Sequence, residues 1–126
     1  MQSFRNLKVW EKAHALALSV YALTKGFPRE ELYGLTAQMR RASVSIGCNI
    51  AEGCCRKGGS EMGRFLQMAL GSASELEYQF VLARDLALLN AVDYERLAHG
   101  VTEVKKMLVA LIQRVRADRV GLKADS

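Results

Sequence analysis

Two groups of residues in this chain have types and spacings that could support chemistry. The first is Glu11 with His14, a Glu-x-x-His pair, which is the spacing used by metal-binding helical bundles to aim two ligands at one ion. Such a site needs a second pair of this kind and two further glutamates. The other histidine, His99, has glutamates four residues before and four residues after it, which is the wrong spacing. We therefore expect no metal and no cofactor, and interpret Glu11 and His14 as an exposed pair.

The second group is a set of cysteines beside basic residues. Cys54 and Cys55 precede Arg56 and Lys57, and nearby cations lower the pKa of a thiol and so favour the nucleophilic thiolate. No histidine is placed to act as a base, however. Together with Cys48 these cysteines are odd in number and form no Cys-x-x-Cys pair. We expect reduced thiols in a core or an interface, and a cytoplasmic protein, because such a set is a poor disulfide framework.

A line of polar residues also crosses a segment that is otherwise apolar. It includes Arg41, Asn49 and Glu52, and Glu75 has a comparable position in the next segment. A carboxylate among apolar residues is costly to bury unless it is paired. We expect Arg41, Asn49, Glu52 and Glu75 to form a structural polar network, between helices or between subunits, that fixes their register. Catalysis by Glu52 with Glu75 is the alternative; we expect no catalytic residue and no enzyme.

The elements that position these side chains are predicted to be helices. The 126 residues suit one soluble domain, with half of them apolar, a quarter charged, one proline and few alternating runs. Helices are expected over about residues 6–25, 30–55 (with a possible separate turn before residue 35), 60–89 and 90–118, with Ser60 and Asn90 as N-caps. Short connections favour an all-α, antiparallel, up-down-up-down four-helix bundle over residues 1–119, followed by a frayed tail, 120–126.

Each expected helix has an apolar face that would build the core. In the fourth helix the apolar residues repeat at alternating spacings of four and three, a heptad pattern. The predicted core residues are Val9, Trp10, Ala13, Leu16, Val20 and Leu23; Leu35, Met39, Ala42, Ile46, Ile50 and Gly53; Phe65, Ala69, Ala73, Leu76, Phe80 and Ala83; and Leu97, Val101, Val104, Leu108, Leu111 and Val115.

The second and third helices carry a second apolar stripe on nearly the opposite side. A helix that is apolar on two sides is buried on two sides. The second neighbour is either another helix of the same chain or another subunit, and the small residues in these stripes favour a subunit. The stripes are Ala37, Val44, Cys48, Ala51 and Cys55 on the second helix, and Met68, Gly71, Leu82, Leu86 and Leu89 on the third.

The charge of the chain favours an anionic partner. It has 18 basic and 13 acidic residues, a formal net charge of +5, and its longest uncharged run, residues 13–24, is too short to span a membrane. A second basic group lies on the fourth helix and consists of Lys105, Lys106, Arg114, Arg116 and Arg119. Without a helix-turn-helix, we expect nucleic acid to be bound through phosphates. The candidate nucleic-acid-binding residues are Arg40, Arg41, Arg56, Lys57 and Arg64, with the turn Gly58-Gly59-Ser60 as a possible phosphate site.

Several of these pieces together resemble a known family. The pieces are Leu7-Lys8-Val9-Trp10, Arg40-Arg41-Ala42, Ser45-Ile46, Asn49-Ile50-Ala51-Glu52-Gly53, Arg56, Phe65, Gly71-Ser72, Glu75-Leu76-Glu77 and Gln79. At this joint spacing, over about residues 4–115, the chain resembles the four-helix-bundle family of 23S rRNA intervening-sequence proteins. The Cys54-Cys55 pair departs from that pattern.

The resemblance carries expectations about assembly and partners. The family is similar to the Avd accessory protein of diversity-generating retroelements, and its members imply a homopentameric barrel with a basic surface. Five copies at +5 would carry +25. The Avd likeness implies binding to nucleic acid and to a reverse transcriptase. We therefore expect a non-enzymatic RNA- or nucleic-acid-binding protein, encoded in an rRNA insertion or accessory to reverse transcription; a protein-interaction scaffold is the alternative.

Overall fold

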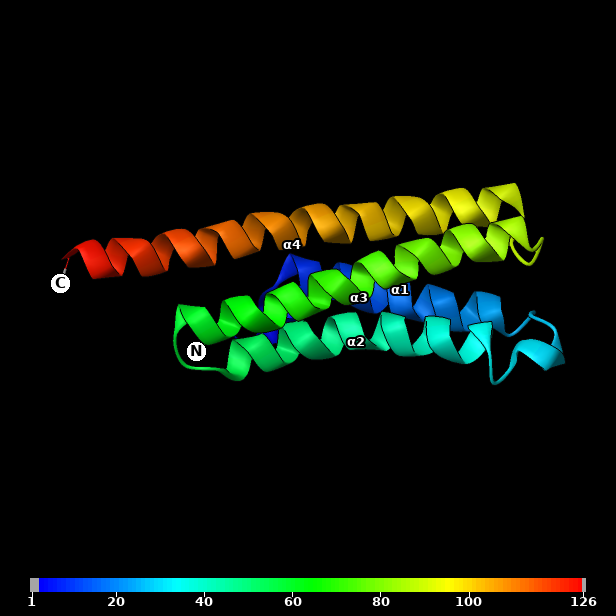
Figure 1. Ribbon diagram of the computed structural model, residues 1–126, viewed down its shortest axis with the longest axis horizontal. Helices are drawn as coiled ribbons and strands as arrows, with labels where there is room; N and C mark the ends of the chain where they lie inside the picture. Colours follow the sequence, from blue (N-terminus) through cyan, green and yellow to red (C-terminus); the bar gives the residue numbers. More distant parts are fainter. Residues whose placement is uncertain (1–2, 126) are drawn as a thin grey trace.

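The computed structural model describes the backbone of residues 3–125 and the side chains of residues 3–118. Over this range the chain is all-α and has no strand. Its elements are η1 (Phe4–Asn6), α1 (Lys8–Thr24), η2 (Arg29–Glu31), α2 (Leu35–Cys55), α3 (Gly59–Asp85) and α4 (Ala91–Asp125). Figure 1 shows the four long helices lying side by side as one bundle. The all-α, four-helix prediction is confirmed, and η2 is the separate turn expected before Leu35.

The helices are joined at the two ends of the bundle. Residues 56–58 link α2 to α3, while the longer α1–α2 connection, with η2, and residues 86–90 lie at the other end (Figure 1). The most extensive packing is between α2 and α3 and between α3 and α4, and α1 packs less closely against α2 and α4. The two contacts of α1, with α2 and with α4, are therefore the more open sides of the bundle.

Local signals explain where α3 and α4 begin. Asn90 caps α4 as predicted, since its Oδ1 accepts a 2.7 Å hydrogen bond from the amide of Asp93. Ser60 was predicted to cap α3, and this is wrong. The helix starts at Gly59, and its N-cap is Gly58 with φ of 90°, a left-handed conformation that glycine adopts without strain.

The end of α3 was predicted near residue 89, but the helix stops at Asp85. The amide of Leu88 donates to the carbonyl of Ala83 at 2.8 Å, and the amide of Ala87 donates to that of Arg84 at 2.9 Å. These are the two hydrogen bonds of a Schellman turn. Ala87 holds the left-handed position, with φ of 61°, where glycine is the usual residue. Because alanine gives no such signal, the sequence did not reveal this turn.

The helix α4 is longer than predicted. It continues to Asp125, past the expected end near residue 118 and through most of the segment 120–126 that was predicted as a tail. This segment has no proline, and Gly121 alone costs only about 1 kcal/mol relative to alanine. Figure 1 shows the C-terminal part of α4 reaching beyond the other helices.

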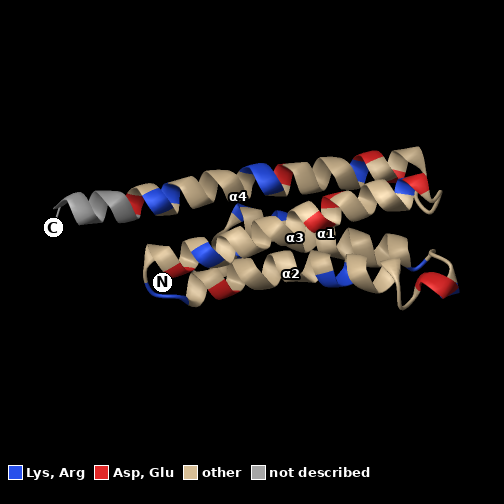
Figure 2. Cartoon of the chain, in the orientation of Figure 1, with Lys and Arg blue, Asp and Glu red and all other residues tan. Residues whose placement is uncertain are grey.

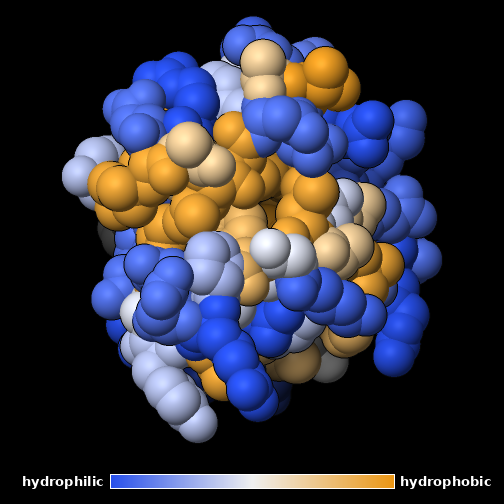
Figure 3. Space-filling model, turned by 90° about the vertical axis from the view of Figure 1, so that its right-hand side faces the viewer, coloured by the Kyte–Doolittle hydropathy of each residue, from blue (hydrophilic) through white to orange (hydrophobic). Residues whose placement is uncertain are grey.

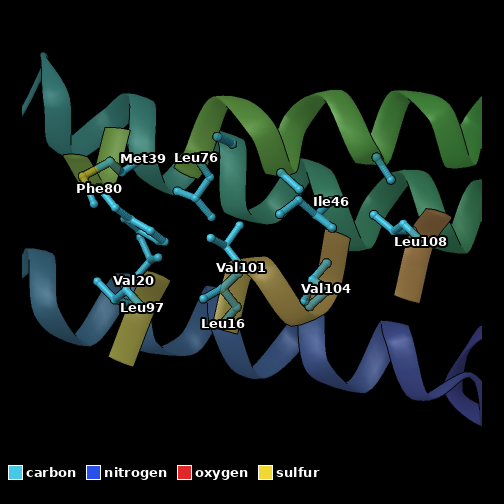
Figure 4. Close-up of a cluster of buried hydrophobic side chains, with 14 of the residues drawn as sticks. Leu16, Val20, Met39, Ile46, Leu76, Phe80, Leu97, Val101, Val104 and Leu108 are labelled. Atoms are coloured by element: carbon cyan, nitrogen blue, oxygen red, sulfur yellow. The ribbon is translucent and has the colours of Figure 1, made fainter. Parts of the chain in front are cut away.

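The core forms where the helical periodicity predicted it. Side chains from all four helices meet there, among them Leu16, Ile46, Phe80 and Val104 (Figure 4). Trp10, Leu23 and Phe65 are only partly buried. On α4 the predicted seam holds to Leu108, after which Ile112 is buried in place of Leu111. A straight helix of 3.6 residues per turn drifts away from a 3.5-residue repeat, which explains the change.

Candidate nucleic-acid interface

The end of the bundle at the α2–α3 turn is rich in exposed cations. Arg56 and Lys57 lie in the turn, Arg64 lies on the first turns of α3, and all three are exposed. Arg116, from the C-terminal part of α4, lies beside the start of α3. We call Arg56, Lys57, Arg64 and Arg116 the basic end (Figure 2 shows Lys and Arg at this turn and along α4).

Phe65 holds two of these guanidinium groups in place. The Cζ atom of Arg56 lies 4.9 Å from the centroid of the Phe65 ring, and that of Arg64 lies 4.8 Å from it. Arg56 also pairs with Glu52, and Arg64 pairs with Glu61 at 3.3 Å. Both pairs are solvent-exposed, so each contributes at most about 1 kcal/mol and can be exchanged for a phosphate.

A hollow of about 360 Å³ lies beside the N-terminus of α3. Arg64 and Arg116 lie on it together with Ser60, Glu61 and Gln67. The first amides of α3 have no side-chain cap, and the N-terminus of a helix carries partial positive charge. The arrangement can accept an anion such as a backbone phosphate.

Arg116 was missed as a partner of the turn. In the sequence it belongs to a separate basic group more than fifty positions after Lys57. The fold brings it to the turn because α4 ends at the same end of the bundle at which α3 begins (Figure 1). The expected antiparallel order of the helices could have revealed this neighbour, because it places the end of the fourth helix near the start of the third.

Arg40 and Arg41 lie apart from the basic end. Sixteen residues of helix separate Arg40 from Arg56, a distance of about 24 Å along the axis. The Nε of Arg40 donates a 2.9 Å hydrogen bond to Thr24 Oγ1, and its guanidinium lies over the ring of Tyr21. Arg41 is exposed. The five predicted residues therefore form two groups rather than one cluster.

The second basic group follows α4. Lys105 donates to Glu77 on α3 at 2.9 Å, which leaves its charge paired, while Lys106 and Arg114 are exposed. The side chain of Arg119, which was predicted in this group, lies outside the described residues. Lys106 and Arg114 thus extend the cationic surface along α4 (Figure 2).

The predicted polar residues are joined in separate pairs within the chain. Asn49 donates to the carbonyl and the hydroxyl of Ser45, and the Ser45 hydroxyl lies 2.9 Å from that of Ser72 on α3. Glu75 accepts a 3.4 Å hydrogen bond from Gln79. Glu52 pairs with Arg56, and Arg41 lies exposed on the outer side of α2. One chain therefore does not connect Arg41, Asn49, Glu52 and Glu75, and a network between subunits stays a prediction.

The surroundings of the cysteines and of the Glu11–His14 pair bear on the nucleophile and the metal site considered above. His14 is exposed and stacks on Trp10 with ring centroids 5.0 Å apart. Burial, and secondarily the neighbouring Cys55, raises the pKa of the Cys54 thiol above its ordinary value. In the part of the chain whose side chains are described, no three His, Cys, Asp or Glu residues are grouped to hold a metal ion, and no helix is long and apolar enough to cross a membrane.

The fold and this surface define a class of small all-α proteins, four-helix bundles with a cationic end. Comparison with known proteins gives the family. The family model of the 23S rRNA-intervening sequence protein matches residues 5–110, and the chain belongs to this family. Among curated proteins no match was found.

A solved structure supports the same assignment. The chain is similar to a protein of unknown function from the S23 ribosomal protein family of Bacteroides thetaiotaomicron, known from a crystal structure. The two share 27% sequence identity and superpose with a TM-score of 0.78, over 83% of this chain and 95% of that one. The resemblance stated from the sequence motifs is confirmed.

Proposed function

We propose that this protein is a non-enzymatic, oligomeric four-helix bundle that binds RNA or another nucleic acid through phosphate contacts. The observation that carries the proposal is the basic end. There, cations from α3, α4 and the α2–α3 turn surround the N-terminus of α3. Glu52 and Glu61 pair with Arg56 and Arg64 there, and both ion pairs are exposed, so a phosphate can displace them.

The proposal includes the topology and the assembly. Figure 1 supports an antiparallel up-down-up-down order, since each helix starts at the end of the bundle where the one before it stops. We propose a homopentamer, which would gather five basic ends on one particle. The free thiols of Cys48, Cys54 and Cys55 suit a reducing cytoplasm. An accessory role in rRNA processing is consistent with the family's name, and a role beside a reverse transcriptase rests on the likeness to the Avd protein.

The salt dependence of RNA binding tests the basic end. Each phosphate that a cation neutralises contributes about −0.7 to −0.9 to the slope of log affinity against log salt concentration. The variant Arg56→Gln/Lys57→Gln/Arg64→Gln should therefore bind a fluorescent RNA of about 30 nucleotides with a slope shallower by about two to three per bound chain. Fluorescence anisotropy between 50 and roughly 300 mM salt measures this.

A matched control removes the same charge at the other end of the bundle. Lys25→Gln/Arg29→Gln/Arg96→Gln changes three exposed cations near the α1–α2 and α3–α4 connections and should leave the slope unchanged. Arg40→Gln/Arg41→Gln tests the separated pair in the same way. An equal loss of slope per charge removed in all three variants would mean that net charge, and not the basic end, binds RNA.

A protein-interaction scaffold is the second candidate function, and the opposite end of the bundle favours it. Figure 3 shows apolar side chains around a hollow at the end that holds the α1–α2 and α3–α4 connections. Tyr33 is 92% exposed and Val92 68% exposed, with Leu32 and Leu86 also largely exposed. Recovery of one stoichiometric protein after nuclease treatment, lost in Tyr33→Ser/Val92→Ser, would support the scaffold.

A further inference from the structure

The open side of the bundle between α1 and α2 forms an apolar groove. Its volume is about 440 Å³, and it is lined by Trp10 and Leu18 from the α1 side and by Val44 and Cys48 from α2. Leu18 is 60% exposed and Val44 is 43% exposed, so these side chains have no complete cover within the chain. The lining on α2 includes Val44, Cys48 and Ala51 from the second apolar stripe that the sequence predicted.

A second surface of the same chain, on the outer face of α3, also has exposed apolar residues without cover in the chain. Met68, Gly71 and Leu82 follow one another on the outer face of α3, and Met68 is 46% exposed. Gly71 lies within the helix, where glycine costs about 1 kcal/mol relative to alanine. A Cβ atom at Gly71 would meet nothing within 4 Å, so no neighbour in the chain requires glycine there. Its absence of a side chain lets another backbone approach α3 closely.

The two surfaces carry opposite charges. Arg41 lies one turn before Val44 on the same face of α2, and Glu75 lies among the outer residues of α3, one turn after Gly71. Both are exposed, and neither takes part in an ion pair with any side chain of residues 3–118. An apolar groove with a cation at its edge thus matches an apolar ridge that carries an anion.

We propose that the α1–α2 groove of one copy binds the outer face of α3 of the next copy, with Arg41 paired to Glu75 across the contact. This inference rests on the oligomeric part of the proposed function and gives it a specific interface. Because the two surfaces differ, the contact is head-to-tail, and its repetition builds a ring where the rotation between copies closes, rather than a two-fold dimer. Bundles that stand side by side in such a ring place α3 antiparallel to the α2 of its neighbour.

This geometry predicts a register that a disulfide can report. When Glu75 faces Arg41 on antiparallel helices, the residue seven positions before Glu75 faces the residue seven positions after Arg41. Those residues are Met68 and Cys48. In a Cys54→Ala/Cys55→Ser background, Met68→Cys should therefore cross-link to Cys48 of the next copy under mild oxidation. Leu82→Cys, which would face Cys48 only if the helices were parallel, is the matched control.

Non-reducing gel electrophoresis of the full-length oxidised protein separates the outcomes. Met68→Cys should give a ladder that extends beyond the dimer, and Leu82→Cys should not. A product limited to dimers would overturn the head-to-tail contact, and a ladder from Leu82→Cys alone would overturn the register. If Met68→Cys forms no cross-link although light scattering shows that the protein is an oligomer, the interface lies elsewhere.

A charge exchange tests the pair independently. Arg41→Glu and Glu75→Arg should each raise the concentration at which half of the protein is assembled by about tenfold, and the double variant should restore it. Failure of the double variant to recover would overturn the pairing. All of these readouts are taken without nucleic acid, so an assembled protein that fails to bind RNA would refute the proposed function and leave this interface standing.

Discussion

The three cysteines, whose type suggests chemistry, have different surroundings in the fold. Cys54 is only 7% exposed, whereas Cys48 and Cys55 are exposed on the same helix. The helical periodicity places Cys48 and Cys55 on the second apolar stripe and Cys54 on neither stripe, so it does not predict that Cys54 is the buried thiol. Adjacent residues in a helix point 100° apart, so Cys54 and Cys55 have different surroundings although they are neighbours in the chain.

This difference predicts an order of thiol reactivity. Burial raises the pKa of Cys54, which reduces its thiolate fraction at neutral pH and shields it from reagents. With limiting iodoacetamide at about pH 7.5, Cys54 should be alkylated at least tenfold more slowly than Cys48 and Cys55. Peptide mass spectrometry over time measures the three rates. Equal rates in folded protein would show that Cys54 is accessible.

The pair between α1 and α4 predicts an acid-dependent contribution to stability. Lys12 Nζ lies 2.9 Å from Glu103 Oε1, and this hydrogen bond and the positive charge hold the pKa of Glu103 below its ordinary value. A carboxylate with a lowered folded-state pKa contributes stability above its unfolded pKa and loses it as the pH falls through the folded value.

Glu103→Gln should therefore unfold at lower urea concentration than the unchanged protein at pH 7, with the difference vanishing near pH 3. The effect is small because both side chains are exposed. Glu95→Gln, an exposed change on the same helix, is the control. A difference that persists at pH 3 would mean that the substitution acts through packing rather than charge.

At the scale of elements, the interior faces, the end of α2 and the start of α4 were predictable, but both ends of α3 and the end of α4 were not. Residues such as Met39, Ile46 and Phe80 recur at the helical period, and burial followed that period closely. The end of α3 depends on one backbone torsion at Ala87, and an alanine in the sequence does not predict a left-handed conformation. The basic end depends on Arg116, which only the packing of α4 against α3 brings to the turn.

The turn after α3 gives a prediction about stability. Ala87 adopts φ of 61°, a conformation that costs an alanine about 1 kcal/mol relative to glycine. Ala87→Gly should therefore raise the free energy of unfolding by up to about 1 kcal/mol. Ala110→Gly, an exposed position inside α4, should lower it by a similar amount. Urea unfolding of both variants checks the opposite signs; a loss in Ala87→Gly would refute the strained turn.

At the scale of the whole molecule, assembly and charge are linked. A single chain carries +5, which is a modest attraction for RNA, and an oligomer adds further basic ends to the same particle. If assembly supplies this avidity, Arg41→Glu should bind RNA about tenfold or more weakly than the Arg41→Glu/Glu75→Arg double variant. Anisotropy at one salt concentration compares them. Equal binding would show that one bundle is sufficient.

The two ends of the bundle also have a directional consequence. The α2–α3 turn is cationic, whereas the end with the α1–α2 and α3–α4 connections has an apolar centre surrounded by charged residues of both signs (Figures 2 and 3). Any particle built from copies that point the same way has one cationic side and one side with apolar centres. Such a two-sided disc would lie on a polyanion with its other side turned outward, where an apolar surface can recruit a second macromolecule to the same place.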